Sequence, residues 1–337
     1  MPRITIGLPV YNGENFITDA LDSILGQTYR DFELIISDNA STDRTKALCE
    51  SYAAMDSRIR YIRNQENLGA ALNYNRVFGL SSGKYFKWAA HDDTLAPEYL
   101  EKCVEVLDRD PSIVLVYTLT QLIDEYGIVV GAHEPDTRGF DSEKPHERFR
   151  SRISRIRPQL PFIPRKLEDP DPIFGLIRAS ALKDIQLFGT CIASDQVLLA
   201  RLALLGRFER LPEGLFYNRD HPQRFVYTHP SRYSHARWYG PARAANVFFP
   251  DWTLFSEFLL TIRQSRLTRY QKARCYPSMA RYLFWNWPRL ARDILMAARP
   301  VVGRAAKTLG RASWPHLALS KAFRFGMARG KPIKHRE

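Results

Sequence analysis

The chain has 337 residues, of which 45% are hydrophobic and 25% charged, and it carries a net charge of +13 with four cysteines. This composition is typical of a folded globular protein with a sizeable core, and it excludes fibrous, disordered and disulfide-rich classes. The cysteines are far apart and form no Cys-x-x-Cys pair, so we expect reduced thiols and no zinc knuckle.

The first residues lack a basic region followed by a long apolar core, so the sequence predicts no secretory signal. The most apolar later window, residues 247–262, contains Pro250, Asp251 and Glu257 and is too polar to span a membrane. We therefore expect a cytoplasmic protein that is not integral to a membrane.

Charge is distributed unevenly along the chain. Residues 224–337 contain 22 Lys and Arg residues against 4 Asp and Glu residues, a net charge of +18, whereas residues 1–223 carry −5. The asymmetry predicts two regions with different surfaces, namely a first domain at 1–223 and a basic C-terminal region at 224–337.

Short apolar runs alternate with helical patterns in the first part of the chain, which is typical of a parallel sheet covered by helices. The predicted strands are residues 3–10, 32–37, 58–63, 84–89 and 112–118. The predicted helices lie near residues 14–26, 42–55, 68–80 and 97–109, and Ser41 and Thr42 are N-cap candidates for the second. Because parallel crossovers are right-handed, this order predicts an open, mostly parallel, doubly wound α/β sheet.

The later part of the chain is less regular. Residues 136–172 are rich in proline and charge and predict a long excursion with one basic helix. A strand leading into a helix is expected at 172–182, a helix at 194–206 and a strand at 208–221. The tail from about residue 240 predicts short basic helices with apolar and cationic faces on opposite sides.

Polar side chains follow four consecutive predicted strands, in the segments PVYNGEN, SDNASTD, NQENLG and HDDT. In an open parallel sheet, ligands bind beyond the carboxyl ends of the strands, so these segments predict one shared cleft. The last segment places Asp92 beside Asp93, so the cleft would hold two adjacent like charges. An exposed pair that leads into a helix is the alternative.

These segments also resemble a known family. The run ITIGLPVYNGENFITDALDSILGQTYRDFELIISDNASTDRT is similar to the opening of inverting nucleotide-sugar glycosyltransferases of family 2, and ENLGAALNYNRVFGLSSGKY is similar to their next block. The resemblance covers roughly residues 3–222, leaves the tail outside, and is specific because several motifs occur in order. It implies a GT-A fold and transfer of a sugar, with inversion, from a nucleotide-diphosphate-sugar to a hydroxyl of a glycan or lipid-linked acceptor in polysaccharide or cell-envelope biosynthesis.

The resemblance implies a role in nucleotide binding for residues in each polar segment, namely Pro9, Tyr11, Asn12, Asp38, Asn75 and Asp92. Asp38 would accept the ring N–H of the base, and Tyr11 would offer a stacking face. The residues alone leave other roles open: Asp38 as a helix N-cap, Tyr11 as a packed turn residue and Asn75 as a solvated helix residue. Gly69 and Gly83 are expected to serve the backbone.

For catalysis, the resemblance implies a divalent cation, Mg²⁺ or Mn²⁺, held by Asp92, Asp93 and His221 against the diphosphate. Ala90 stands where the family usually has a further acid, which weakens this expectation. Asp195, at the start of a late helix, would be the base that takes the acceptor proton, although helix capping also explains it. Arg219, two residues before His221, is expected to reach the diphosphate.

The basic aromatic tail admits three interpretations: contact with an anionic membrane, packing on the core, or nucleic-acid binding. We favour peripheral contact at the inner face of the cell membrane, because members of the family commonly act on lipid-linked glycans, and we expect no nucleic-acid partner. A scaffold protein with an impaired metal site is an alternative function. A nucleotidyltransferase is disfavoured, because the loop after the first strand has one glycine and no basic residue.

Overall fold

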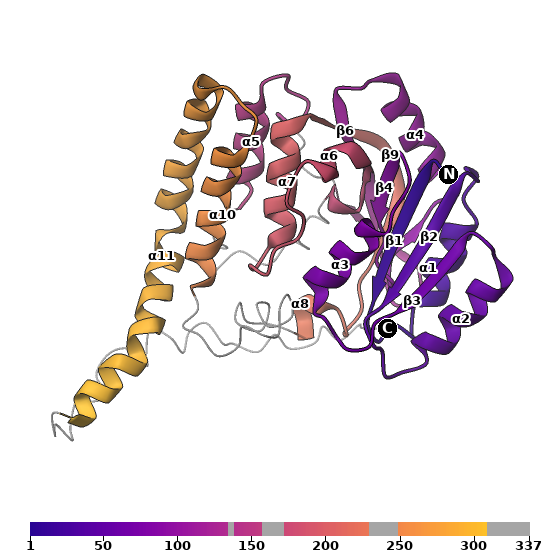
Figure 1. Cartoon of the computed structure of the whole chain (residues 1–337), viewed down its shortest axis with the longest axis horizontal. Helices are drawn as coiled ribbons and strands as arrows, with labels where there is room; N and C mark the ends of the chain where they lie inside the picture. The colour runs from indigo at the N-terminus through magenta and orange to yellow at the C-terminus, as the bar shows by residue number, and fades with distance from the viewer. Residues whose placement is uncertain (134–137, 157–171, 229–248, 309–337) are drawn as a thin grey trace, which may run out of the picture.

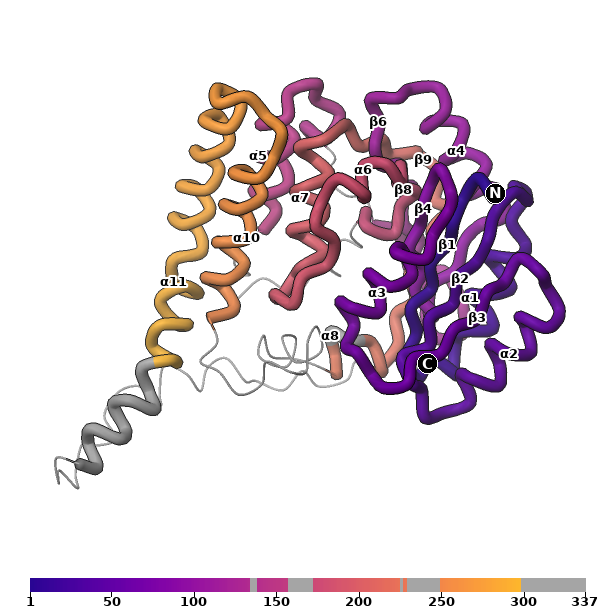
Figure 2. The backbone as a smooth tube through the Cα atoms, viewed as in Figure 1, coloured from indigo at the N-terminus to yellow at the C-terminus, as the bar shows by residue number. Residues whose placement is uncertain are grey.

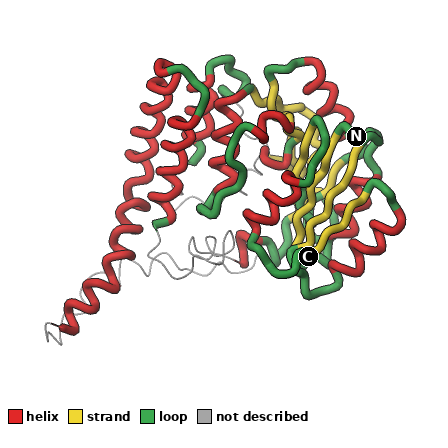
Figure 3. The backbone as a smooth tube through the Cα atoms, in the orientation of Figure 1, coloured by secondary structure: helices red, strands yellow, loops and turns green. Residues whose placement is uncertain are grey.

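The computed structural model describes residues 1–133, 138–156, 172–228 and 249–308, and within them nine strands form one sheet. The strands follow the order β3-β2-β1-β4-β8-β6-β9-β5, and β7 pairs with β6. Figure 3 shows the strands in yellow, on the right of the view. Their bounds are β1 Ile4–Val10, β2 Phe32–Asp38, β3 Ile59–Arg63, β4 Tyr85–Trp88, β5 Thr94–Leu95, β6 Ile113–Ile123, β7 Val129–His133, β8 Leu176–Arg178 and β9 Arg207–Arg219.

The predicted α/β fold is confirmed, with an addition that the sequence did not reveal. β1 pairs in parallel with β2 and β4, β2 with β3, and β6 with β9. β8 enters antiparallel between β4 and β6, and β7 and β5 are antiparallel to their neighbours. The sheet is therefore mixed, because three short strands, β5, β7 and β8, run against the others.

Helices cover both faces of this sheet (Figure 1). The helices of the first part are α1 Ile17–Leu25, α2 Thr45–Met55, α3 Ala70–Gly79 and α4 Tyr99–Arg109, and those of the later part are α5 Pro145–Ser154, α6 Ala179–Lys183, α7 Ser194–Leu205, α8 Phe225–Thr228, α10 Pro250–Gln264 and α11 Arg269–Thr308. Apolar side chains of α1, α2 and α4 share one core with the sheet, and those of α3, α6 and α7 share another. β1 is buried on both faces, as expected for a central parallel strand.

The two glycines expected to serve the backbone do so. Gly69, the residue before α3, has φ 82°, a left-handed conformation that favours glycine. Gly83 precedes β4, where an added Cβ would lie 2.6 Å from the backbone nitrogen of Thr5. These positions fix how the chain enters α3 and β4, the elements that carry parts of the site.

The C-terminal helices belong to a third core. Buried side chains of α5, α7, α10 and α11 form one hydrophobic cluster, so α10 and α11 pack on helices that precede them in the chain. α11 is one helix of 40 residues, whereas the sequence predicted several short ones. Figure 2 shows α11 at the outer side of the molecule, farthest from the strands. Within the described residues, no helix is both long and apolar enough to cross a membrane.

Candidate active site

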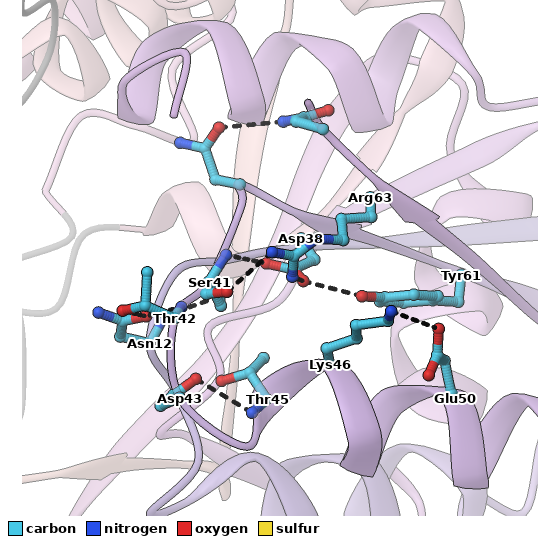
Figure 4. Close-up of polar contacts among 12 residues, drawn as sticks. Asn12, Asp38, Ser41, Thr42, Asp43, Thr45, Lys46, Glu50, Tyr61 and Arg63 are labelled. Atoms are coloured by element: carbon cyan, nitrogen blue, oxygen red, sulfur yellow. Dashed lines mark hydrogen bonds and ion pairs between the residues drawn. The ribbon is translucent and has the colours of Figure 1, made fainter. Parts of the chain in front are cut away.

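The loops after β1 and β2 are joined by hydrogen bonds at the carboxyl edge of the sheet (Figure 4). Asn12, with φ 53°, donates its backbone N–H to Ser41 Oγ at 2.9 Å, and its Oδ1 accepts from the N–H of Thr42 at 2.8 Å. The Gly13 N–H donates to Thr45 Oγ1 at 2.8 Å. Asn12 thus fixes the shape of both loops, while the neighbouring Tyr11 is 45% exposed and leaves its ring accessible.

Asp38, at the end of β2, is fully buried, and both of its oxygens are used. Oδ1 accepts from the Ser41 N–H at 2.8 Å, and Oδ2 accepts from Tyr61 Oη at 2.8 Å and Arg63 Nη1 at 2.7 Å (Figure 4). Because α2 begins only at Thr45, the alternative of Asp38 as a helix N-cap is wrong. A ligand N–H that approached Asp38 would compete with Tyr61 and Arg63, two partners that the sequence analysis missed.

The partners of Asp38 come from β3, where Arg63 lies directly opposite Asp38 in the register of the two strands. Tyr61 precedes Arg63 by two residues, so the two side chains lie on the same side of β3. Burial raises the pKa of Tyr61, and its hydrogen bond to Asp38 adds to the effect. The alternation Tyr61-x-Arg63 was the available signal, because alternate residues of a strand lie on one face.

Asparagine side chains form a second network next to Asp38, and the sequence analysis missed it as well. Asn64 Nδ2 donates to Asn39 Oδ1 at 3.0 Å and to Asn73 Oδ1 at 3.1 Å, and Ser37 Oγ donates to Asn73 Oδ1 at 2.7 Å. The network connects β2, the residue after β3 and α3. Its members are buried, so the ends of these elements are held in fixed positions.

Asn75, predicted to face a nucleotide, uses its side chain elsewhere. Its Nδ2 donates to the carbonyl of Phe188 at 2.8 Å, and its Oδ1 accepts from the Phe188 N–H at 3.0 Å. This pair of bonds attaches α3 to the loop before α7. A direct nucleotide contact by Asn75 stays a prediction, and the observed bonds give the residue a positioning role.

Asp92 and Asp93 follow β4 and have different surroundings. Asp92 Oδ2 lies 3.1 Å from His221 Nε2, so two of the predicted metal ligands meet. Asp93 is buried, and its Oδ1 accepts from Asn218 Nδ2 at 2.9 Å and from the N–H of Arg219 at 3.0 Å. Asp93 therefore binds the end of β9, and a metal contact by Asp93 stays a prediction.

The two carboxyl groups also differ in charge. Burial and the neighbouring Asp92 carboxylate raise the pKa of Asp93. Burial by itself would raise the pKa of Asp92, but the neighbouring His91 and the hydrogen bond from His221 outweigh burial and lower the pKa. Asp92 is thus the member of the pair that stays ionised, which is the form a cation binds.

The Arg219 side chain makes its hydrogen bonds within the protein, and the expected contact with the diphosphate stays a prediction. Arg219 is 2% exposed, and Nε donates to the Asp92 carbonyl at 3.0 Å while Nη2 donates to Asp19 Oδ2 at 2.8 Å. Its guanidinium lies 4.9 Å from the centre of the Phe16 ring. The residue consequently holds the Asp92 backbone in place through the hydrogen bond to its carbonyl.

The residues present fit a divalent cation only in part. In the described portion of the chain, no cluster of three or more His, Cys, Asp or Glu side chains has the arrangement of a metal site. Asp92 supplies one ionised carboxylate and His221 one imidazole, whose Nδ1 is buried and has no hydrogen-bond partner. Mg²⁺ usually keeps waters and substrate phosphates in its shell, so one or two protein ligands suffice when a diphosphate is present.

Asp195 lies in the first turn of α7, as predicted, directly after Ala193 in a left-handed conformation and Ser194. Its Oδ2 accepts from Gln196 Nε2 at 3.1 Å. The charges of Asp92, Asp93 and Asp195 all raise the pKa of the Tyr74 phenol, after burial as the main cause. Tyr74, on α3, packs against Phe188 at 5.1 Å between ring centres, and the sequence analysis did not single it out.

Comparison with known proteins gives a consistent result. Residues 5–185 match the family model described as Glycosyl transferase family 2. An uncharacterized glycosyltransferase of Rickettsia typhi is 35% identical over 146 residues, which is 42% of this chain and 44% of that protein. One from Methanocaldococcus jannaschii is 26% identical over 196 residues, 58% of this chain and 66% of that protein. The chain thus spans less than half of the length of the Rickettsia relative.

Solved structures share the fold. S. aureus TarS 1–349 in complex with UDP-GlcNAc aligns with a TM-score of 0.59 and 17% identity over 86% of this chain and 79% of that chain. The mannosyltransferase PcManGT from Pyrobaculum calidifontis, in complex with GDP-Man and Mn²⁺, aligns with a TM-score of 0.54 and 19% identity over 92% of this chain and 81% of that chain. The likeness extends into the helical C-terminal region.

Proposed function

The chain belongs to glycosyl transferase family 2, and from that premise we propose that it moves a sugar from a nucleotide-diphosphate-sugar to a hydroxyl of a glycan or lipid-linked acceptor. We further propose inversion at the anomeric carbon and a role in polysaccharide or cell-envelope biosynthesis in the cytoplasm. The observation that carries the proposal is the pairing of Asp92 with His221 at the carboxyl edge of the sheet, since a leaving diphosphate needs groups there that can hold a cation.

The nucleotide would bind across the joined loops. Tyr11 offers an exposed ring for stacking, with Pro9 and Asn12 in the same loop behind it. Asp38 would read the base, either directly or through Arg63, whose side chain is 35% exposed while Asp38 is fully covered. Asn75 would act by holding the loop at Phe188. The structures of TarS with UDP-GlcNAc and of PcManGT with GDP-Man support a sugar-nucleotide donor.

Asp92 and His221 would hold Mg²⁺ or Mn²⁺, with Asp93 fixing the backbone beside them. When bound, the cation would neutralise charge on the leaving diphosphate. The Mn²⁺ in the PcManGT complex supports a divalent cation. His221 packs against Phe16 at 4.5 Å between ring centres, which restricts its imidazole to one orientation.

Asp195 would accept the proton of the acceptor hydroxyl as that oxygen attacks the anomeric carbon from the side opposite the diphosphate. Asp195 lies in the first turn of α7, and its Oδ2 accepts from Gln196 Nε2 at 3.1 Å. Displacement by a single attack of this kind inverts the anomeric configuration.

A donor screen tests the proposal. Purified protein is incubated with UDP-, GDP- and dTDP-sugars, with Mn²⁺, Mg²⁺ or EDTA, and with or without simple sugars or a polyprenyl phosphate as acceptor. We expect one donor to release nucleoside diphosphate in a cation-dependent way, and Asp92→Asn to lose that dependence. Binding of a nucleotide without turnover of any donor would instead favour the scaffold alternative, for which the alanine at position 90 is the motivating feature.

A further inference from the structure

Helix α11 carries large apolar side chains on two opposite faces. One face packs on α5 and α10 and buries Cys275, Met279, Tyr282 and Leu290. The other face presents Phe284, Trp287 and Leu295, which are 71%, 65% and 67% exposed. Residues advance about 100° per position around a helix, so Phe284 lies directly opposite Cys275. We call Phe284, Trp287 and Leu295 the outer face.

Arginines line one side of this outer face. Arg274, Arg281 and Arg292 are exposed, and their separations of 7 and 11 residues correspond to about two and three helical turns. Between residues 269 and 297 the sequence has six Lys and Arg residues and one acid, Asp293. Asp293 is buried, and its Oδ2 accepts from the Asp251 N–H at 2.7 Å. The outer face is therefore bordered by an arginine row, and the exposed side of α11 carries no acidic side chain between residues 269 and 297.

The fold does not need the outer face for its own packing. The inner side attaches α11 through its buried cluster, through Trp252 Nε1, which donates to the Leu290 carbonyl at 3.0 Å, and through Asn286 Nδ2, which donates to the Ile156 carbonyl at 3.2 Å. Contiguous exposed apolar side chains on a folded surface mark an interaction site. α11 also lies on the side of α5, α7 and α10 that faces away from the sheet, so a partner there leaves the carboxyl edge free (Figure 1).

We propose that the outer face of α11 lies on an anionic lipid surface, with Phe284, Trp287 and Leu295 in the headgroup and acyl boundary and the arginine row at the lipid phosphates. Tryptophan prefers that boundary, and arginine can extend its charged end to the headgroups while its stem stays in apolar surroundings. The positive charge of the arginine row favours anionic lipid over a second copy of the chain as the partner. A second copy would bring another arginine row against this one, whereas anionic lipid complements it.

A nucleic acid would also complement the charge, but the outer face suits it less. Bases stack on flat aromatic rings in a positive groove, whereas Leu295 and the neighbouring exposed Ile294 offer branched aliphatic groups on a convex helix. Burial of such groups is favourable in lipid. The surface therefore fits a bilayer of negative charge better than a nucleic acid.

Vesicle sedimentation with the full chain tests the proposal. Vesicles of phosphatidylcholine, with or without phosphatidylglycerol, are mixed with wild type, with Phe284→Ser/Trp287→Ser/Leu295→Ser, and with Arg274→Gln/Arg281→Gln/Arg292→Gln. The matched control is Ile128→Ser/Val130→Ser, which removes apolar groups of 62% and 63% exposure at the start of the β7 hairpin, next to Asp124 and Glu125.

We expect wild type and the hairpin control to sediment with phosphatidylglycerol vesicles. The serine variant should bind at least roughly tenfold more weakly, because each buried apolar side chain of this size contributes about that factor. The glutamine variant should bind about fivefold more weakly for each charge removed and should lose most of its salt dependence. Circular dichroism confirms that all variants are folded.

Several results would overturn the proposal. Absence of wild-type sedimentation would do so, as would equal binding by the serine variant. A wild-type dimer that the serine variant converts to a monomer would assign the face to a second copy, and salt-dependent binding of an oligonucleotide that competes with vesicles would assign it to nucleic acid. Sedimentation needs no turnover, so its failure leaves the proposed glycosyl transfer untouched.

Discussion

The carboxyl edge of the sheet and the outer face of α11 differ in the polarity and the burial of their side chains. At the sheet edge, Asp38, Asp93 and Asn73 are polar, buried and provided with partners, which is the arrangement of a preorganised site. On α11, Phe284 and Trp287 are apolar and exposed. A buried polar group that is fully paired indicates a site completed by the protein itself, whereas an exposed apolar group indicates a surface that something else completes.

Asp38→Ala should break the sheet edge most severely. The substitution leaves Tyr61 Oη and the Arg63 guanidinium without their carboxylate, and we expect the free energy of unfolding to fall by about 2–4 kcal/mol. Urea unfolding measures the change. Asp56→Ala is the matched control, because the Asp56–Arg58 pair has the same 2.7 Å separation but is partly exposed, so its loss should cost about 1 kcal/mol or less. Equal losses would show that burial does not matter here.

Lys87→Met should stabilise the protein. Lys87 is a buried cation on β4 that donates to the Phe174 carbonyl and lies 4.6 Å from the centre of the Tyr99 ring, and burial lowers its pKa to about 8. Methionine has a similar shape without the charge, and Tyr99 Oη still donates to Phe174 at 3.2 Å. We expect a gain of roughly 1–3 kcal/mol in the free energy of unfolding at pH 7.

The gain from Lys87→Met should depend on pH in a defined direction. Between pH 8 and about 10.4, the usual lysine pKa, the unfolded chain holds a proton on Lys87 that the folded protein has lost, so wild-type stability from this group rises with pH. The advantage of the methionine variant should therefore shrink across that window. Urea unfolding of both proteins at pH 7 and pH 10 checks it, and an advantage that grows with pH would contradict the assignment.

Asn75→Ala separates a positioning role from a nucleotide contact. Loss of two hydrogen bonds to the Phe188 backbone should reduce the free energy of unfolding by about 1–2 kcal/mol and speed hydrogen exchange in the loop before α7. Asn15→Ala, which removes an exposed bond to Gln223, is the control and should change stability little. Unchanged stability with weakened nucleotide binding would restore the predicted direct contact.

The smallest stability effect is expected on α11. Phe284→Ser/Trp287→Ser/Leu295→Ser removes three side chains, yet the free energy of unfolding should change by only about 0.5 kcal/mol for each, because these side chains are largely exposed and the ring contact of Phe284 is with its neighbour Trp285. Tyr282→Ser, on the buried side of the same helix, should cost about 3–5 kcal/mol. Thermal unfolding compares the two, and similar losses would mean that the outer face is part of the core.

Much of the fold could be predicted from the sequence, because apolar runs of strand length separated by helical patterns determine a parallel core and place Asp38 and Asp92 at one edge. The antiparallel β8 could not, since its pairing with β4 and β6 joins segments far apart in the chain. The predicted caps were also wrong: α2 begins at Thr45, and Ser41 Oγ instead accepts from the N–H of Asn12.

Some roles within the site could likewise be predicted from the sequence, and others could not. The family resemblance grouped Asp92 with His221, and the pairing of β5 with β9 brings them together. The partners of Asp93 and Asn75 lie 125 and 113 residues away, and no local pattern specifies them. On α11, periodicity indicates where apolar residues recur around the helix but not which of two apolar faces packs on α5. Tyr74 was missed because its ring partner, Phe188, lies 114 residues away in the chain.

The most direct test of the proposed site is the rate of nucleoside diphosphate release by wild type and by Asp195→Asn, with Mn²⁺-dependent nucleotide affinity measured on the same preparations. If Asp195 is the base, release in the presence of acceptor should fall by roughly 10²–10⁴-fold while the affinity is retained, because the carboxamide cannot take a proton. Release at the wild-type rate by Asp195→Asn would contradict the account.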